Sequence, residues 1–178
     1  IELQNSAGGV ALLDERWRRR PVGLVTIAAL EGDQPLLSPT FYLERALNPF
    51  AEVRNGDIAT LLGRELSVLA LADVGKIAAP DRALLDTWIE DGGVLVRFAG
   101  PKLAQDVDDL VPVQLRPGQR ALGGAMAWTE PARLAPFPEA GPFAGLVVPG
   151  DVLINAQVLA EPPVDIGEHT WARLEDGT

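Results

Sequence analysis

The sequence predicts an α/β domain: a three-layer, flavodoxin-like parallel sheet with added antiparallel β structure in its C-terminal half. Strong apolar strands alternate with helices in the first part of the chain, which is the pattern of βαβ units. The apolar runs are continuous, as in parallel strands buried on both faces. Ten of the fifteen prolines lie at Pro101 or later, where helical periodicity fades.

The first apolar run is Val22–Leu30, VGLVTIAAL, and it contains several β-branched residues. We expect a central strand here, followed by a loop. Ser38 is a favourable N-cap and Pro39 suits the first position of a helix, which we expect over Phe41–Leu47. Strand, loop and helix together form half of a βαβ unit.

A weaker pattern comes next. Ala51–Arg54 has the composition of an edge strand. Asp57 can cap a short helix that runs through Leu62 and closes at Gly63, a residue type that commonly ends helices in the left-handed conformation.

The clearest strand–helix–strand unit lies in the middle of the chain. Leu66–Ala72 is the second strong strand, and Val94–Phe98 is the third, also expected to be buried. Pro80 opens the helix between them, and Gly92 is placed to cap its end. The apolar face of this helix is formed by Leu84, Leu85, Trp88 and Ile89.

Beyond Pro101 we expect one short helix, marked by Leu103, Val107 and Leu110, and then loops and short strands. We treat residues 12–110 as the α/β core and residues 111–178 as additions to the same single domain of residues 1–178. The expected strands are Val111–Leu115, Ala121–Trp128, Asp151–Leu159 and Thr170–Leu174.

Composition excludes several classes of function. The net charge of −10 argues against nucleic acid as a partner. The chain contains no cysteine, which excludes disulfides, thiolate metal sites and a cysteine nucleophile. No apolar run approaches the roughly 18 residues of a membrane helix. The chain starts at Ile1 and ends after an Asp-Gly turn signal, so we expect a fragment of a longer protein.

Ligands of parallel α/β sheets bind beyond the carboxyl ends of the strands. The loops in question are Glu31–Gln34, Asp73–Lys76 and Ala99–Lys102. Clustered carboxylates there could bind Mg²⁺, as in a phosphoacceptor module, but Asp and Gly are also common turn formers. We predict no metal and no cofactor. The candidate ligand-binding residues are Glu31, Asp33, Asp73 and Gly100.

Catalytic motifs are missing from these loops. Glu31–Gln34 replaces the G-x-G-x-x-G of dinucleotide-binding proteins, and Gly75-Lys76 lacks the other residues of a P-loop. His169 is the only histidine, and no serine stands in G-x-S-x-G. We therefore predict no catalytic residue.

Three successive segments, LSVLALADVGKI, ALLDTWIEDGG and VLVRFAGP, resemble the class I glutamine amidotransferase-like fold. The similarity is to the branch that includes trehalose-utilisation-type proteins and many bacterial membrane-anchored proteins. The later segments LVPVQLRPGQRALGGAMAW and APFPEAGPFAGL resemble bacterial membrane proteins of unknown function with an aerotolerance-operon-type N-terminal double membrane span.

This resemblance implies the scaffold of an amidotransferase without its reaction. In the enzymes, the strand matching Val94–Phe98 leads to an elbow with the catalytic cysteine, whereas this chain has Gly100-Pro101 there. We expect a non-catalytic module for protein interaction or small-ligand sensing. It would be a soluble domain of a bacterial inner-membrane protein, and the resemblance does not specify on which side of the membrane it lies. Its only attachment to the membrane would be through segments of the parent chain outside this sequence. The alternative is a carboxylate-dependent hydrolase or sugar-modifying enzyme that uses Glu31 and Asp73.

Overall fold

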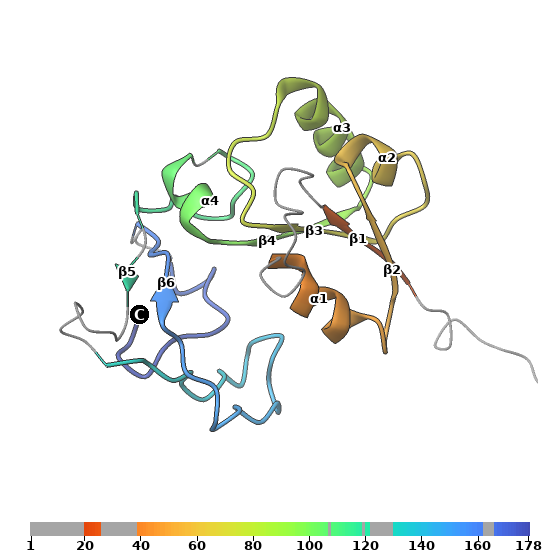
Figure 1. Ribbon diagram of the computed structural model, residues 1–178. Coiled ribbons are helices and arrows are strands. Elements are labelled where there is room, and N and C mark those ends of the chain that lie inside the picture. The colour runs from red at the N-terminus through yellow and green to blue at the C-terminus, as the bar shows by residue number, and fades with distance from the viewer. Residues whose placement is uncertain (1–19, 26–38, 107, 119, 122–129, 162–165) are drawn as a thin grey trace, which may run out of the picture. The chain divides into compact units, whose positions relative to one another are not determined.

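The computed structural model describes residues 20–25, 39–106, 108–118, 120–121, 130–161 and 166–178 (Figure 1). The chain divides into two compact units. The first unit comprises Ile1–Ala70 and Ala83–Val96, and the second comprises Leu71–Arg82 and Arg97–Thr178. The predicted strand continuation after Val25 and the loop with Glu31 and Asp33 lie outside the described residues.

A four-stranded, all-parallel sheet confirms the predicted α/β class. Its strands follow one another in space in the order β2-β1-β3-β4, which is compatible with the flavodoxin-like order 2-1-3-4-5. The strands are β1 (Pro21–Val25), β2 (Glu52–Gly56), β3 (Val68–Ala72) and β4 (Val94–Phe98).

Burial follows this order closely. All five residues of β1 are buried, as are the last four residues of β3, because both strands have a neighbour on each side. β2 lies at an edge, as predicted. The prediction that β4 is a buried strand was wrong: β4 is the other edge of the described sheet, and Val94 and Phe98 are 52% and 44% exposed.

Helices cover both faces of the strands in the first unit. Figure 1 shows α1 on one face and α2 and α3 on the opposite face, which gives the layered arrangement expected of parallel sheets. The helices of the chain are α1 (Pro39–Leu47), α2 (Ile58–Leu62), α3 (Ala79–Glu90) and α4 (Pro101–Gln105). Within the described ranges, none of them is long and apolar enough to cross a bilayer.

Helix α2 is capped as predicted at its start. The Thr60 N–H donates to Asp57 Oδ1 at 2.8 Å, and the Thr60 hydroxyl donates to Asp57 Oδ2 at 2.8 Å. These bonds lower the pKa of Asp57, the backbone N–H most strongly. Gly63 closes the helix as predicted, with its N–H donating to Ala59 O at 3.1 Å and a right-handed φ of −68°.

Helix α3 shows why two glycines follow it. Gly92 has a φ of +95°, which an L side chain rarely adopts, and Gly93 packs against the ring of Trp88. A Cβ on Gly93 would lie 2.3 Å from two atoms of that ring. The apolar face is narrower than predicted, because Leu85 is fully buried whereas Leu84 is 46% exposed.

The C-terminal half contains little regular structure within the described residues. α4 ends at Gln105, so Leu110 does not continue the helix as predicted. Strand β5 (Arg120–Ala121) pairs antiparallel with β6 (Ala156–Gln157). Isolated antiparallel bridges join Leu115 to Ala160, Ala132 to Ile154 and Leu134 to Leu174.

Candidate functional site

Asp73 lies at the carboxyl end of β3, where the sequence placed a ligand-binding loop. Its φ of 52° is left-handed, a conformation that Asp tolerates better than most residues. Its backbone N–H donates to Phe98 O at 2.9 Å, which joins the end of β3 to the end of β4. The residue is half-buried.

The side chain of Asp73 caps helix α4. Its Oδ1 accepts the N–H of Lys102 at 3.0 Å and the N–H of Leu103 at 3.1 Å. Gly100, the N-cap residue, has no side chain for this task, and Pro101 at the first helical position has no N–H. The next N–H, from Ala104, donates to Gly100 O at 3.0 Å. All donors of the first helical turn are therefore satisfied inside the second unit.

Gly100 is held in contact with the same carboxylate. It is buried, and a Cβ built on it would lie 2.5 Å from Asp73 Cγ and 2.7 Å from Asp73 Oδ1. Any side chain at position 100 would clash with Asp73. The turn between β4 and α4 is thus packed directly against the carboxylate of Asp73.

The structure brings together two of the four predicted ligand-binding residues, Asp73 and Gly100. The other two, Glu31 and Asp33, lie outside the described residues. Lys76 and Lys102, which flank the site in sequence, are exposed. Across the described ranges, no group of three or more histidine, aspartate or glutamate side chains could hold a metal ion.

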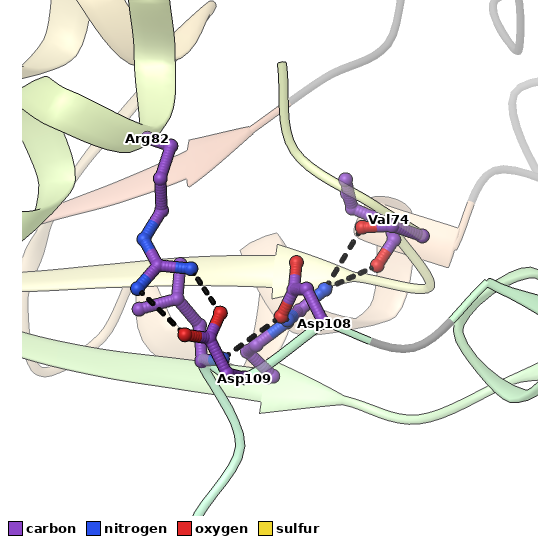
Figure 2. A network of polar contacts seen from close by, with 7 residues as sticks. Val74, Arg82, Asp108 and Asp109 are labelled. Carbon is purple, nitrogen blue, oxygen red and sulfur yellow. Dashed lines mark hydrogen bonds and ion pairs between the residues drawn. The ribbon is translucent and has the colours of Figure 1, made fainter. Parts of the chain in front are cut away.

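A second polar network lies in the same unit, and sequence reasoning missed it (Figure 2). Arg97 of β4 forms an ion pair with Asp108, and their side chains are only 5% and 8% exposed. Arg97 Nη2 also donates to Val74 O at 2.6 Å and to Gly75 O at 3.0 Å. The network therefore ties the loop after β3 to the segment after α4. A lone arginine within the apolar run VLVRF was the signal available in the sequence.

The neighbouring pair of Arg82 and Asp109 is different in character. Figure 2 shows the guanidinium of Arg82 facing the carboxylate of Asp109, which is 79% exposed. The hydrogen bonds from Arg82 lower the pKa of Asp109. This pair is solvent-screened, so its contribution to the site is small compared with that of the buried pair.

An open cavity of about 780 Å³ lies beside α4 in the second unit. Asp108, Asp109 and Glu161 give its wall an acidic character, and Val111 and Val113 give it an apolar part. Asp108 Oδ1 accepts both the guanidinium and the Leu110 N–H, whereas Asp108 Oδ2 and Arg97 Nε have no hydrogen-bond partner among the described residues.

His169 is exposed and lies in a turn closed by its N–H to Ile166 O at 3.2 Å, just before the strand expected at Thr170–Leu174. We call the carboxyl ends of β3 and β4, with Asp73 and Gly100, the switch point. Chemically, it offers a carboxylate bound to backbone amides and a glycine packed against it, a combination suited to holding a loop in place.

Comparisons with known proteins return no match for this chain: no family model, no curated protein and no solved structure.

Proposed function

We propose that this chain is a non-catalytic binding module on a class I glutamine amidotransferase-like scaffold, which recognises a small ligand or a protein partner. The contact between Asp73 and Gly100 supports the proposal most directly. In the enzymes that the sequence resembles, the elbow after the strand carries the nucleophile. In this chain the corresponding space holds a carboxylate whose Oδ1 binds the Lys102 and Leu103 amides.

The sequence context supports the non-catalytic part independently. The chain has no cysteine to act as the amidotransferase nucleophile and only one histidine, which is exposed in a turn. The parallel sheet in the order β2-β1-β3-β4 is compatible with the three-layer, flavodoxin-like scaffold that we propose. We place the chain as a domain of a bacterial membrane-anchored protein, on the strength of the sequence resemblance alone.

The test is a search for turnover that depends on the strand-end carboxylates. We would measure glutamine hydrolysis and the hydrolysis of nitrophenyl esters and glycosides by the purified chain, beside Glu31→Gln and Asp73→Asn variants. We expect no turnover above the buffer rate. A general acid or base contributes on the order of 10²–10⁴ in rate. Turnover that falls by about 100-fold or more in either variant, with an unchanged melting temperature, would instead establish the carboxylate-dependent hydrolase.

A further inference from the structure

A second cavity, remote in sequence from the switch point, has the opposite electrostatic character to the chain as a whole. It measures about 410 Å³ and lies entirely within the second unit, around residues 157–160 and 166–178. Arg116 and Arg173 line it, and no aspartate or glutamate is among its described lining residues. In a chain of net charge −10, this local excess of positive charge selects for an anion.

The remaining wall is largely apolar. Val158, Leu159 and Ile166 line the cavity, and each is half-buried. Cavities that bind small molecules typically measure about 300–1,000 Å³ and combine an apolar wall with a few fixed polar groups. Two guanidinium groups over an aliphatic wall suit a ligand with one anionic end and one apolar body.

The backbone of Arg116 is fixed on one side of the cavity. The Arg116 N–H donates to Leu159 O at 2.8 Å, and the Glu161 N–H donates to Gln114 O at 2.7 Å. Between these bonds lies the antiparallel bridge from Leu115 to Ala160. Arg116 thus projects from a paired segment, which lowers the entropic cost of ordering it around a ligand.

The backbone of Arg173 is fixed as well. Its carbonyl oxygen accepts the Ala135 N–H at 2.8 Å, and the next residue, Leu174, is bridged to Leu134 and buried. The turn that precedes Arg173 is closed by the Thr170 hydroxyl, which donates to Ile166 O at 2.6 Å. The side chains of Arg116 and Arg173 therefore both extend from hydrogen-bonded backbone.

Glu161 is the natural competitor for the anion. Its Oε1 lies 3.6 Å from Arg116 Nε, and the two side chains are 50% and 47% exposed. Such exposed, long ion pairs contribute little, so a ligand can displace Glu161 at small cost. Arginine can then present its planar donors to a carboxylate in a bidentate manner.

We propose that this cavity binds a small carboxylate with an aliphatic body, held by Arg116 and Arg173. The inference rests on the proposed function in that it names the chemical class of the ligand for the binding module, but the two have separate tests. Turnover that depends on the carboxylates of the switch point would overturn the non-catalytic function without affecting carboxylate binding in this cavity. A failure of this cavity to bind a small carboxylate would overturn only the present inference.

The test is a titration of the ¹⁵N-labelled chain with hexanoate, followed by amide chemical shifts. We expect saturable shifts at Leu159, Ala160 and Thr170. Hexan-1-ol should bind at least about tenfold more weakly and hexylammonium not at all, because each lacks the charge-assisted bonds to arginine. Absence of saturable shifts with hexanoate, or tighter binding of hexylammonium or hexyl phosphate, would overturn the proposal.

Three variants locate the binding site. Arg116→Gln and Arg173→Gln should each weaken hexanoate binding by about tenfold or more. Arg64→Gln makes the same charge change on an exposed residue of the first unit and should leave binding unchanged. Glu161→Gln should tighten binding by about two- to fivefold, because it frees Arg116. A gain of affinity cannot arise from misfolding, so unchanged or weaker binding in Glu161→Gln counts against the site.

Discussion

The carboxylate of Asp73 occupies the space that any side chain at position 100 would need. A Cβ on Gly100 would lie 2.5 Å from Asp73 Cγ, although the two residues are far apart in the sequence. The same carboxylate holds the first turn of α4 through two backbone amides. The end of β3 and the start of α4 are therefore built around one aspartate, and the predictions below begin from this pair.

Replacing Gly100 by alanine should destabilise the chain by about 1–3 kcal/mol, the usual cost of overpacking a tight contact. Urea unfolding measures this cost. In an Asp73→Gly background the cost of Gly100→Ala should be smaller by at least about 0.5 kcal/mol, since the clashing carboxylate is gone. Gly150→Ala is the matched control, because nothing lies within 4 Å of a Cβ there. Strict additivity of the two changes would contradict the contact.

Asp73→Asn should be tolerated better than Asp73→Ala. Asparagine keeps an oxygen for the two amides of α4 and accepts a left-handed φ, whereas alanine offers neither. Loss of a cap costs about 1 kcal/mol and a left-handed alanine about 1–2 kcal/mol more. Equal unfolding free energies of the two variants would show that the cap contributes nothing.

Breaking the buried pair of Arg97 and Asp108 should be severe. Asp108→Asn leaves the guanidinium of Arg97 buried without a counter-charge, which costs about 3–5 kcal/mol. The double variant Arg97→Met/Asp108→Leu should be more stable than Arg97→Met alone or Asp108→Leu alone, because the apolar pair removes both charges, whereas each single change leaves one buried charge unpaired. Denaturant midpoints give the order of the three. The exposed pair provides the control, and Arg82→Met should change stability little.

The two glycines after α3 should respond to different substitutions. Gly92→Asn should be milder than Gly92→Ala, because asparagine tolerates the left-handed φ of +95°. Gly93→Ala should cost about 1–3 kcal/mol by overpacking against Trp88 and should change the tryptophan emission spectrum. An unchanged spectrum and midpoint in Gly93→Ala would disprove the contact with the ring.

Acid should selectively weaken the cap of α2. The pKa of Asp57 is lowered from its ordinary value of 3.8 by the folded state, so its stabilising effect is complete at neutral pH and is lost as pH falls through that lowered pKa. Asp57→Asn retains an acceptor for the Thr60 N–H but does not titrate. The melting-temperature advantage of the wild-type chain over Asp57→Asn should shrink below about pH 4. A gap that stays constant or widens in acid would contradict the assignment.

Local signals in the sequence predicted much of the first unit. The start of α2 was predicted from Asp57 before a short apolar segment, and the end of α3 from the double glycine after an amphipathic segment. Both signals act within a few residues of the helix end, so the sequence is sufficient to recognise them. The parallel sheet followed from the continuous apolar runs of β1 and β3. These features depend on hydrogen bonds and backbone conformations that neighbouring residues determine.

The features that could not be predicted depend on which segments meet in space. The burial of β4 depends on having a further strand beside it, which the run VLVRF cannot specify. Arg97 and Asp108 pair across a helix and a turn, and nothing in their spacing marks them as partners. Asp73 was correctly placed in a strand-end loop, but its role as the cap of α4 required the contact with Gly100.

Because Asp73 supplies the cap that α4 lacks locally, that helix cannot be complete before the end of β3 has docked. Hydrogen exchange at the amides of Lys102 and Leu103 therefore reports on whether the end of β3 is docked against α4. Their exchange with deuterated solvent should slow or quicken together with that of the Asp73 amide, which is bonded to Phe98. The three amides should form one cooperative opening unit, in which α4 unravels and the strand ends separate as a single step.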